Sequence, residues 1–143
     1  MRGRKRSASK HVGGNNMKLT DQKKATWEKT LRDSGLIGLI DTIQEHTKGD
    51  LWEFGQIRGD FFFTTEKFVY VSGGLIAKAT FSIPYNKITG LKLCNVGNIP
   101  LLPTGIRVTY TDENGKTVKK RCSVLKRKQW LAYLQEKTGN SAN

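Results

Sequence analysis

The chain has 143 residues, the length of a single domain, and 36% of them are apolar, which is enough for a hydrophobic core. Lysine and arginine number 25 against 12 acidic residues, a formal charge of +13. The sequence has no run of about 18 apolar residues, and no apolar segment follows its basic start. It therefore predicts neither a membrane-spanning helix nor a secretory signal, and we expect a cytoplasmic protein, with peripheral membrane contact left open.

The first segment is basic and almost free of large apolar residues. Residues 1–16 hold five Lys/Arg, no acid and one large apolar side chain, so they are predicted to be a disordered leader. We interpret this leader as a stretch that precedes a true start at Met17. The alternative is a basic arm that contacts anionic partners.

Residues 17–49 are predicted to form one or two helices. Thr20 is the expected N-cap of the first, and Ser34-Gly35 interrupts the helical pattern. The second is predicted from apolar residues at i, i+3, i+4 and i+7, which form one stripe: Leu36, Leu39, Ile40 and Ile43. We expect this stripe to pack against the rest of the domain, and Lys48-Gly49 to end the helix.

From Asp50 onwards, short apolar runs alternate with turn residues every 8–12 residues, a spacing typical of consecutive antiparallel strands. Seven strands are predicted: 51–58, 60–64, 67–72, 75–83, 88–95, 104–111 and 116–122. The last two are expected to form a hairpin through Asn114-Gly115. After Ser123 the apolar residues return to helical spacing as far as Lys137, and residues 139–143 are predicted to be a flexible tail.

This order of elements predicts an α+β fold that is mainly β. A seven-stranded antiparallel sheet curls or closes into a barrel to hide its edges, and the C-terminal helix covers the open end. The segment from Gly59 to Gly73 resembles pleckstrin-homology-like domains of the GRAM and bacterial PH groups: a glycine, an apolar strand, a Thr-centred turn and a second apolar strand. Three further stretches follow in the order of that family: Phe81–Ile88, Thr104–Tyr110 and Lys126–Trp130.

The resemblance covers about residues 51–137 and implies a PH-like domain over residues 50–138 that binds a lipid, a phosphoinositide or a protein. The best-known lipid motif of the family places several cations around the loop between the first two strands. This sequence has Arg58 followed by Gly59-Asp60 there. Specific phosphoinositide recognition is therefore not expected.

No motif indicates catalysis. His11 lies in the leader, and His46 is expected to be a solvent-facing helix residue that is not coupled to a cysteine or serine nucleophile. The acids are scattered among Lys and Arg, and no phosphate-binding glycine loop is present. Cys94 and Cys122 are wrongly spaced for a zinc site; free thiols are expected, with a disulfide as the alternative. The sequence predicts no enzyme, no metal and no cofactor.

The positive charge is concentrated in the second half of the chain. Residues 17–66 hold seven Lys/Arg and nine acids, whereas residues 67–143 hold thirteen Lys/Arg and three acids. The cations of residues 116–128, with Arg107 from the neighbouring strand, are predicted to bind an anionic ligand: Arg107, Lys116, Lys119, Lys120, Arg121, Lys126, Arg127 and Lys128. The alternative is that these charges only keep the surface solvated.

The loop Asn95–Pro103 carries three apolar residues, Ile99, Leu101 and Leu102, which are predicted to cover the barrel mouth or to dock a partner. We therefore predict a non-catalytic binding module that contacts a protein partner or an anionic membrane surface through the last strand and closing helix. Non-sequence-specific binding of nucleic acid and homo-oligomerisation are the alternatives.

Overall fold

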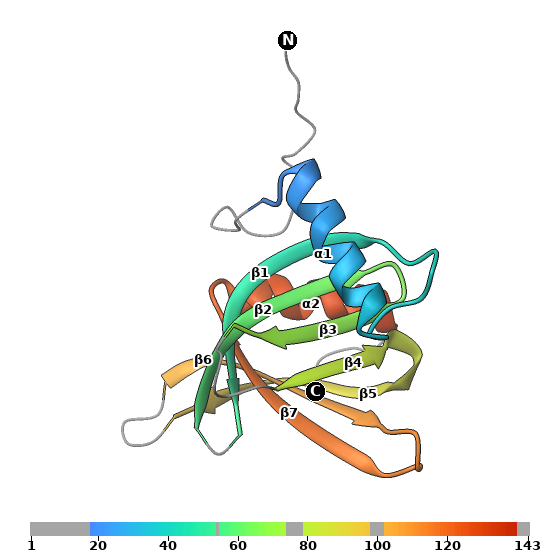
Figure 1. The fold of residues 1–143 in the computed structure, drawn as a ribbon. Coiled ribbons are helices and arrows are strands. Elements are labelled where there is room, and N and C mark those ends of the chain that lie inside the picture. Colours follow the sequence, from blue (N-terminus) through green and yellow to red (C-terminus); the bar gives the residue numbers. More distant parts are fainter. Residues whose placement is uncertain (1–17, 54, 74–78, 98–101, 140–143) are drawn as a thin grey trace.

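The computed structural model of the chain describes residues 18–53, 55–73, 79–97 and 102–139. The predicted leader and most of the predicted tail lie outside these ranges. The elements, shown in Figure 1, are α1 (Asp21–Asp33), β1 (Ile43–Trp52), β2 (Gln56–Thr64), β3 (Lys67–Ser72), β4 (Thr80–Pro84), the 3₁₀ turn η2 (Tyr85–Lys87), β5 (Ile88–Val96), β6 (Leu102–Thr111), β7 (Thr117–Val124) and α2 (Arg127–Thr138). None of the helices in these ranges is long and apolar enough to cross a membrane.

The seven strands form one antiparallel sheet in the order β4-β3-β2-β1-β7-β6-β5. β1 joins the two halves, because it pairs with β2 along its length and with β7 over Gly49–Trp52. The sheet curls into two layers, and β4 and β5 remain its two edges. The predicted curled sheet with a C-terminal helix is confirmed, whereas the alternative of a closed barrel is wrong.

The main core lies between the two layers and α2. Trp130 of α2 stacks on Phe63 of β2, with ring centroids 4.5 Å apart and planes 4° from parallel. Leu131 and Leu134 are buried with Trp130, so the helical spacing predicted for this segment is confirmed. Burial of this helical face fixes α2 against the inner surface of the curled sheet.

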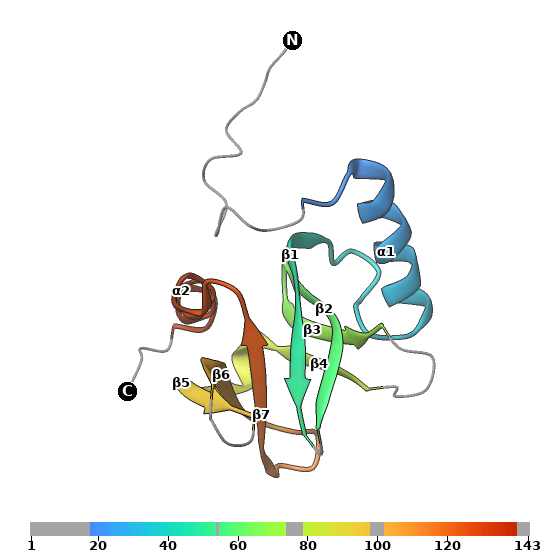
Figure 2. The same ribbon diagram turned by 90° about the vertical axis from the view of Figure 1, so that its left-hand side faces the viewer.

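α1 packs on the outer surface of the β1–β3 layer, on the other side from α2 (Figure 2). The predicted cap is confirmed, since the Thr20 hydroxyl accepts a hydrogen bond from the Lys23 N–H at 3.1 Å. Leu31 is fully buried, and the rings of Trp27 and Phe62 lie 4.7 Å apart. Because successive strand residues face opposite sides, Phe62 meets α1 while Phe63 meets α2.

The predicted second helix is wrong. Ile43–Trp52 is a strand, and the predicted stripe does not exist as one surface: Ile43 is buried, but Leu39 and Ile40 in the preceding loop are 89% and 87% exposed. Gly49, the predicted helix end, lies inside β1 at its first pair with β7. In β1 the main chain forms hydrogen bonds with β2 and β7, which are distant in the sequence. These contacts determine the structure of the segment more strongly than the helical spacing of four apolar residues does.

Several strand boundaries also differ from the prediction. Residues 51–58 are not one strand, because the β1–β2 hairpin turns between Trp52 and Gln56. The predicted strand 60–64 is the second part of β2, and β4 begins at Thr80, with residues 75–78 outside the described ranges. A turn at Glu53, rather than at Gly59-Asp60, accounts for the shift, since the Glu53 N–H donates to the Gly55 carbonyl at 3.1 Å.

Candidate functional site

The outer surface of the β5–β7 layer carries an aligned row of cations. Ile106, Val108 and Cys122 are buried in the core, so the alternating residues of β6 and β7 point outwards. Arg107 lies directly opposite Arg121, and Lys92 of β5 lies directly opposite Arg107. Lys119 is on the same side of β7. We call these four residues, Lys92, Arg107, Lys119 and Arg121, the basic face.

The basic face has no compensating acid among the residues that the structure describes. None of its four cations makes an ion pair there, and Trp52 of β1 continues the row opposite Arg121. Like charges directly opposite each other on neighbouring strands destabilise a sheet. The row therefore opposes folding and concentrates positive potential on one surface.

Cys94 lies beside this row, and the positive charges of nearby arginines affect the pKa of its thiol. Burial raises the pKa of the Cys94 thiol, while Arg121, Arg107 and Arg127 act in the opposite direction. Cys94 and Cys122 are both free thiols, as predicted. Burial also raises the pKa of Cys122, so neither thiol is activated as a nucleophile.

Two of the predicted anion-binding residues are occupied by contacts within the domain. Lys120 lies opposite the buried Val108, on the inner side of β7, and makes an ion pair with Glu53. The Arg127 guanidinium donates to the main-chain carbonyls of Cys94 at 2.8 Å and Gly105 at 3.3 Å, which ties α2 to β5 and β6. The structure therefore does not bring these two cations to the basic face.

The remaining predicted cations lie at the ends of β7. Lys116 is exposed in the β6–β7 hairpin turn, where its N–H donates to the Asp112 carboxylate. Lys126 and Lys128 are exposed at the start of α2. Of the predicted docking loop, Ile99 and Leu101 lie outside the described ranges, and Leu102, the first residue of β6, is 48% exposed.

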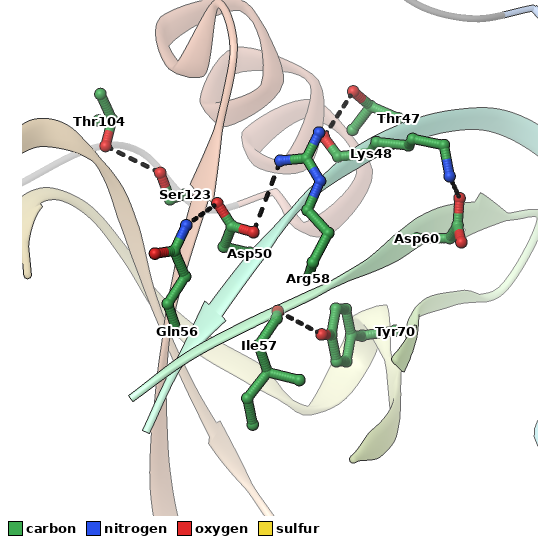
Figure 3. Close-up of polar contacts among 10 residues, drawn as sticks. All are labelled: Thr47, Lys48, Asp50, Gln56, Ile57, Arg58, Asp60, Tyr70, Thr104 and Ser123. Atoms are coloured by element: carbon green, nitrogen blue, oxygen red, sulfur yellow. Dashed lines mark hydrogen bonds and ion pairs between the residues drawn. The ribbon is translucent and has the colours of Figure 1, made fainter. Parts of the chain in front are cut away.

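A small groove lies where β1 separates from the chain after β7. Its volume is about 240 Å³, and its walls include Lys48, Arg58, Ser123 and Leu125. Figure 3 shows that its cations have acidic partners: Arg58 lies 3.5 Å from Asp50, and Lys48 3.2 Å from Asp60. The Thr104 and Ser123 hydroxyls bond to each other at 2.8 Å. Because its charges are paired, this groove adds little positive potential to the basic face.

The expectation that His46 faces solvent on a helix is wrong. His46 is buried on β1 under α1, and its Nε2 lies 2.7 Å from Asp60 Oδ1. Burial alone would raise the pKa of Asp60, but hydrogen bonds from His46 and Lys48 outweigh it, so that pKa lies below its usual value. This pair fixes β1 to β2. No group of three metal-ligating side chains occurs in the part of the chain that the structure describes.

Lys92 is the residue of the basic face that sequence reasoning missed. A signal was present, because Leu91 and Leu93 in the predicted strand 88–95 place Lys92 outwards by alternation. Lys92 does not belong to an acid-free run of cations, since its neighbours in the chain are apolar. Only the strand register shows that it stands beside Arg107.

No protein-family model matches the chain, and no curated protein does. Among solved structures, it is similar to the C-terminal domain of an unknown protein from Leishmania infantum, with a TM-score of 0.59, 19% identity, and coverage of 81% of this chain and 97% of that one. It is also similar to the hSac2 domain from human phosphoinositide phosphatase Sac2, with a TM-score of 0.56, 5% identity, and coverage of 88% and 89%.

A pleckstrin homology domain from Shewanella amazonensis aligns with a TM-score of 0.42 and 17% identity, over 81% of this chain and 95% of that one. The strand order and the C-terminal helix are those that the resemblance in the sequence implied. The fold is pleckstrin-homology-like. At these identities the likeness concerns the PH-like fold alone, and the finer assignment to the GRAM group stays a prediction.

Proposed function

We propose that this PH-like chain is a non-catalytic binding module whose basic face binds the surface of an anionic membrane. The observation that carries the proposal is the row Lys92–Arg107–Arg121, three like charges that are aligned across three strands and make no ion pair with the residues described. Such a row costs stability in the free protein. An anionic bilayer attracts the same cations, because each Lys or Arg near its surface contributes about 1 kcal/mol to the free energy of binding.

Exposed apolar residues favour a membrane over nucleic acid. Leu125, which follows β7, is 66% exposed, and Leu102 opens β6 with 48% exposed. The two lie at the same end of the antiparallel β6–β7 pair, next to Lys126. Aliphatic side chains gain free energy at the boundary of the acyl chains but gain nothing from phosphates in water.

Two further features support a membrane surface. Trp52, half-buried opposite Arg121, is of a residue type that prefers the membrane–water interface. One of the similar structures is a domain of a phosphoinositide phosphatase. The contact that we propose is nevertheless a diffuse attraction to negative charge, since Lys48 and Arg58 of the groove beside β1 are paired within the protein.

Vesicle binding tests the proposal. We expect the chain to co-sediment with vesicles that contain phosphatidylserine and not with vesicles of phosphatidylcholine alone. Raising the salt from about 0.05 M to about 0.3 M should weaken binding at least about tenfold, because the Debye length falls below the spacing between protein and lipid charges. Equal binding to both vesicles, or no effect of salt, would reject the proposal. Stronger binding to duplex DNA at equal phosphate concentration would favour the nucleic-acid alternative.

A further inference from the structure

One edge of the sheet lies open along a groove. β4 pairs only with β3, and no strand in the described part of the chain covers its other side. A groove of about 430 Å³ runs beside it, and all five residues of the strand, Thr80–Pro84, line this groove. The opposite wall is formed by Tyr110–Asn114, with Lys87 at the corner between the two walls. A groove of this volume is large enough for a ligand of several residues.

The main-chain groups that face the groove follow from the register. The Ser72 N–H donates to the Ala79 carbonyl at 3.0 Å, so residue 79 directs its main-chain groups towards β3. Because hydrogen-bonded and non-hydrogen-bonded pairs alternate in an antiparallel ladder, Phe81 and Ile83 also face β3. The N–H and C=O groups of Thr80 and Ser82 therefore face the groove, and the structure gives them no partner among the residues it describes.

Pro84 agrees with this assignment. By the same alternation as for Thr80 and Ser82, the main-chain nitrogen of Pro84 faces the groove and not β3. The absence of an N–H in proline therefore removes no hydrogen bond between β4 and β3. An unpaired edge of this kind is a template for another strand. The groove beside these main-chain groups leaves space for such a strand.

Both walls of the groove are held in place by contacts of their own. The Ser82 hydroxyl donates to the Leu36 carbonyl at 2.5 Å, which fixes β4 against the loop after α1. On the other wall, the Asp112 carboxylate accepts hydrogen bonds from the N–H groups of Asn114 and Lys116, each at 2.9 Å. A rigid groove lowers the ordering cost of binding, because only the incoming segment has to become ordered.

We propose that the β4 edge binds an extended peptide segment of a partner protein, which adds an eighth strand to the sheet beside Thr80–Pro84. The side chains of such a strand alternate between two environments. One set lies on the side of the half-buried ring of Tyr110 and the buried Phe81, and the other lies on the side of the Ser82 hydroxyl and the loop after α1. The segment recognised is therefore one in which apolar and polar residues alternate. The strand β4 lies in the half of the sheet that does not carry the basic face, although the second wall of the groove is the end of β6 and the turn after it.

The experiment selects peptides from a displayed random library on the full chain and then maps them by amide hydrogen exchange. In the free protein the amides of Phe81 and Ile83 should exchange slowly and those of Thr80 and Ser82 rapidly. An enriched peptide should protect the Thr80 and Ser82 amides. Failure to enrich any peptide, or protection confined to other residues, would overturn the proposal.

A pair of variants at one position isolates the main-chain contact. Thr80→Pro removes one groove-facing N–H, whereas Thr80→Ala keeps it; Thr80 is exposed at the start of an edge strand, where proline is tolerated. Thr80→Pro should weaken peptide binding about five- to tenfold, and Thr80→Ala should leave it unchanged. Both should bind anionic vesicles like the wild type, which separates this proposal from the previous one.

Equal affinity of the two variants for the peptide would contradict the proposal. A dimer of the wild type that Thr80→Pro abolishes, measured by light scattering, would assign the edge to a second copy of this chain instead. If Thr80→Pro lowers the melting temperature, the exchange map on the wild-type protein decides alone.

Discussion

Reversal of the three aligned cations, in the variant Lys92→Glu/Arg107→Glu/Arg121→Glu, is expected to weaken binding to phosphatidylserine vesicles by at least about a hundredfold. Each cation contributes about 1 kcal/mol at an anionic surface, and the loss of three contributions amounts to about 3 kcal/mol. Repulsion between the new carboxylates and the lipid weakens binding further. Co-sedimentation at low salt measures the change.

The reversal should leave the stability of the fold nearly unchanged. It replaces a row of three positive charges by a row of three negative charges, so the repulsion between neighbouring strands is the same. The matched control reverses three exposed or half-exposed lysines in or just before the first turn of α1, Lys18, Lys23 and Lys24, with the same change in net charge. This control should lose less than about tenfold. Equal losses in the two variants would mean that net charge alone governs binding.

Gly49→Ala is expected to destabilise the domain by about 3 kcal/mol or more. A Cβ at this position would overlap the Ser123 carbonyl oxygen and would lie 2.8 Å from both a Phe61 ring carbon and a Val124 methyl. The closest of these atoms is main chain and cannot move without shifting β7. The β1–β7 pairing holds the two halves of the sheet together, and the substitution would strain this pairing.

Urea denaturation measures this effect, with Gly38→Ala as the matched control. A Cβ at Gly38 meets nothing within 4 Å, so its replacement should change the free energy of unfolding by no more than about 0.5–1 kcal/mol. Equal midpoints for the two alanine variants would show that the β1–β7 contact tolerates a side chain. The close packing of β7 and Phe61 against Gly49 would then not be the reason why a glycine occupies this position.

Local alternation predicted the parts of the structure that depend on neighbours in the chain. The outward positions of Arg107, Lys119 and Arg121 follow from their alternation with apolar residues of the same strands, and the structure places them so. The α2 face that contains Trp130 follows from helical spacing in the same way. The order of strands and the C-terminal helix were then enough to predict the PH-like class.

The features that the sequence did not predict depend on contacts between segments that are distant in the chain. β1 was mistaken for a helix because its main-chain partners on β2 and β7 have no signal near residues 43–52. Lys120 was assigned to the anion-binding residues because its partner Glu53 lies 67 residues away in the chain. The contacts of Arg127 have no sequence signal for a related reason, since its acceptors are main-chain carbonyls, which no sequence pattern marks.

The most direct test of the basic face is the orientation of the domain on a bilayer. Nanodiscs that contain phosphatidylserine and a small fraction of gadolinium-chelating lipid enhance the NMR relaxation of amides close to the membrane. The proposed binding mode predicts the largest enhancement at β6 and β7 around Arg107 and Arg121, and little at α1. Strongest relaxation at α1 or β4, or uniform relaxation over the whole domain, would contradict it.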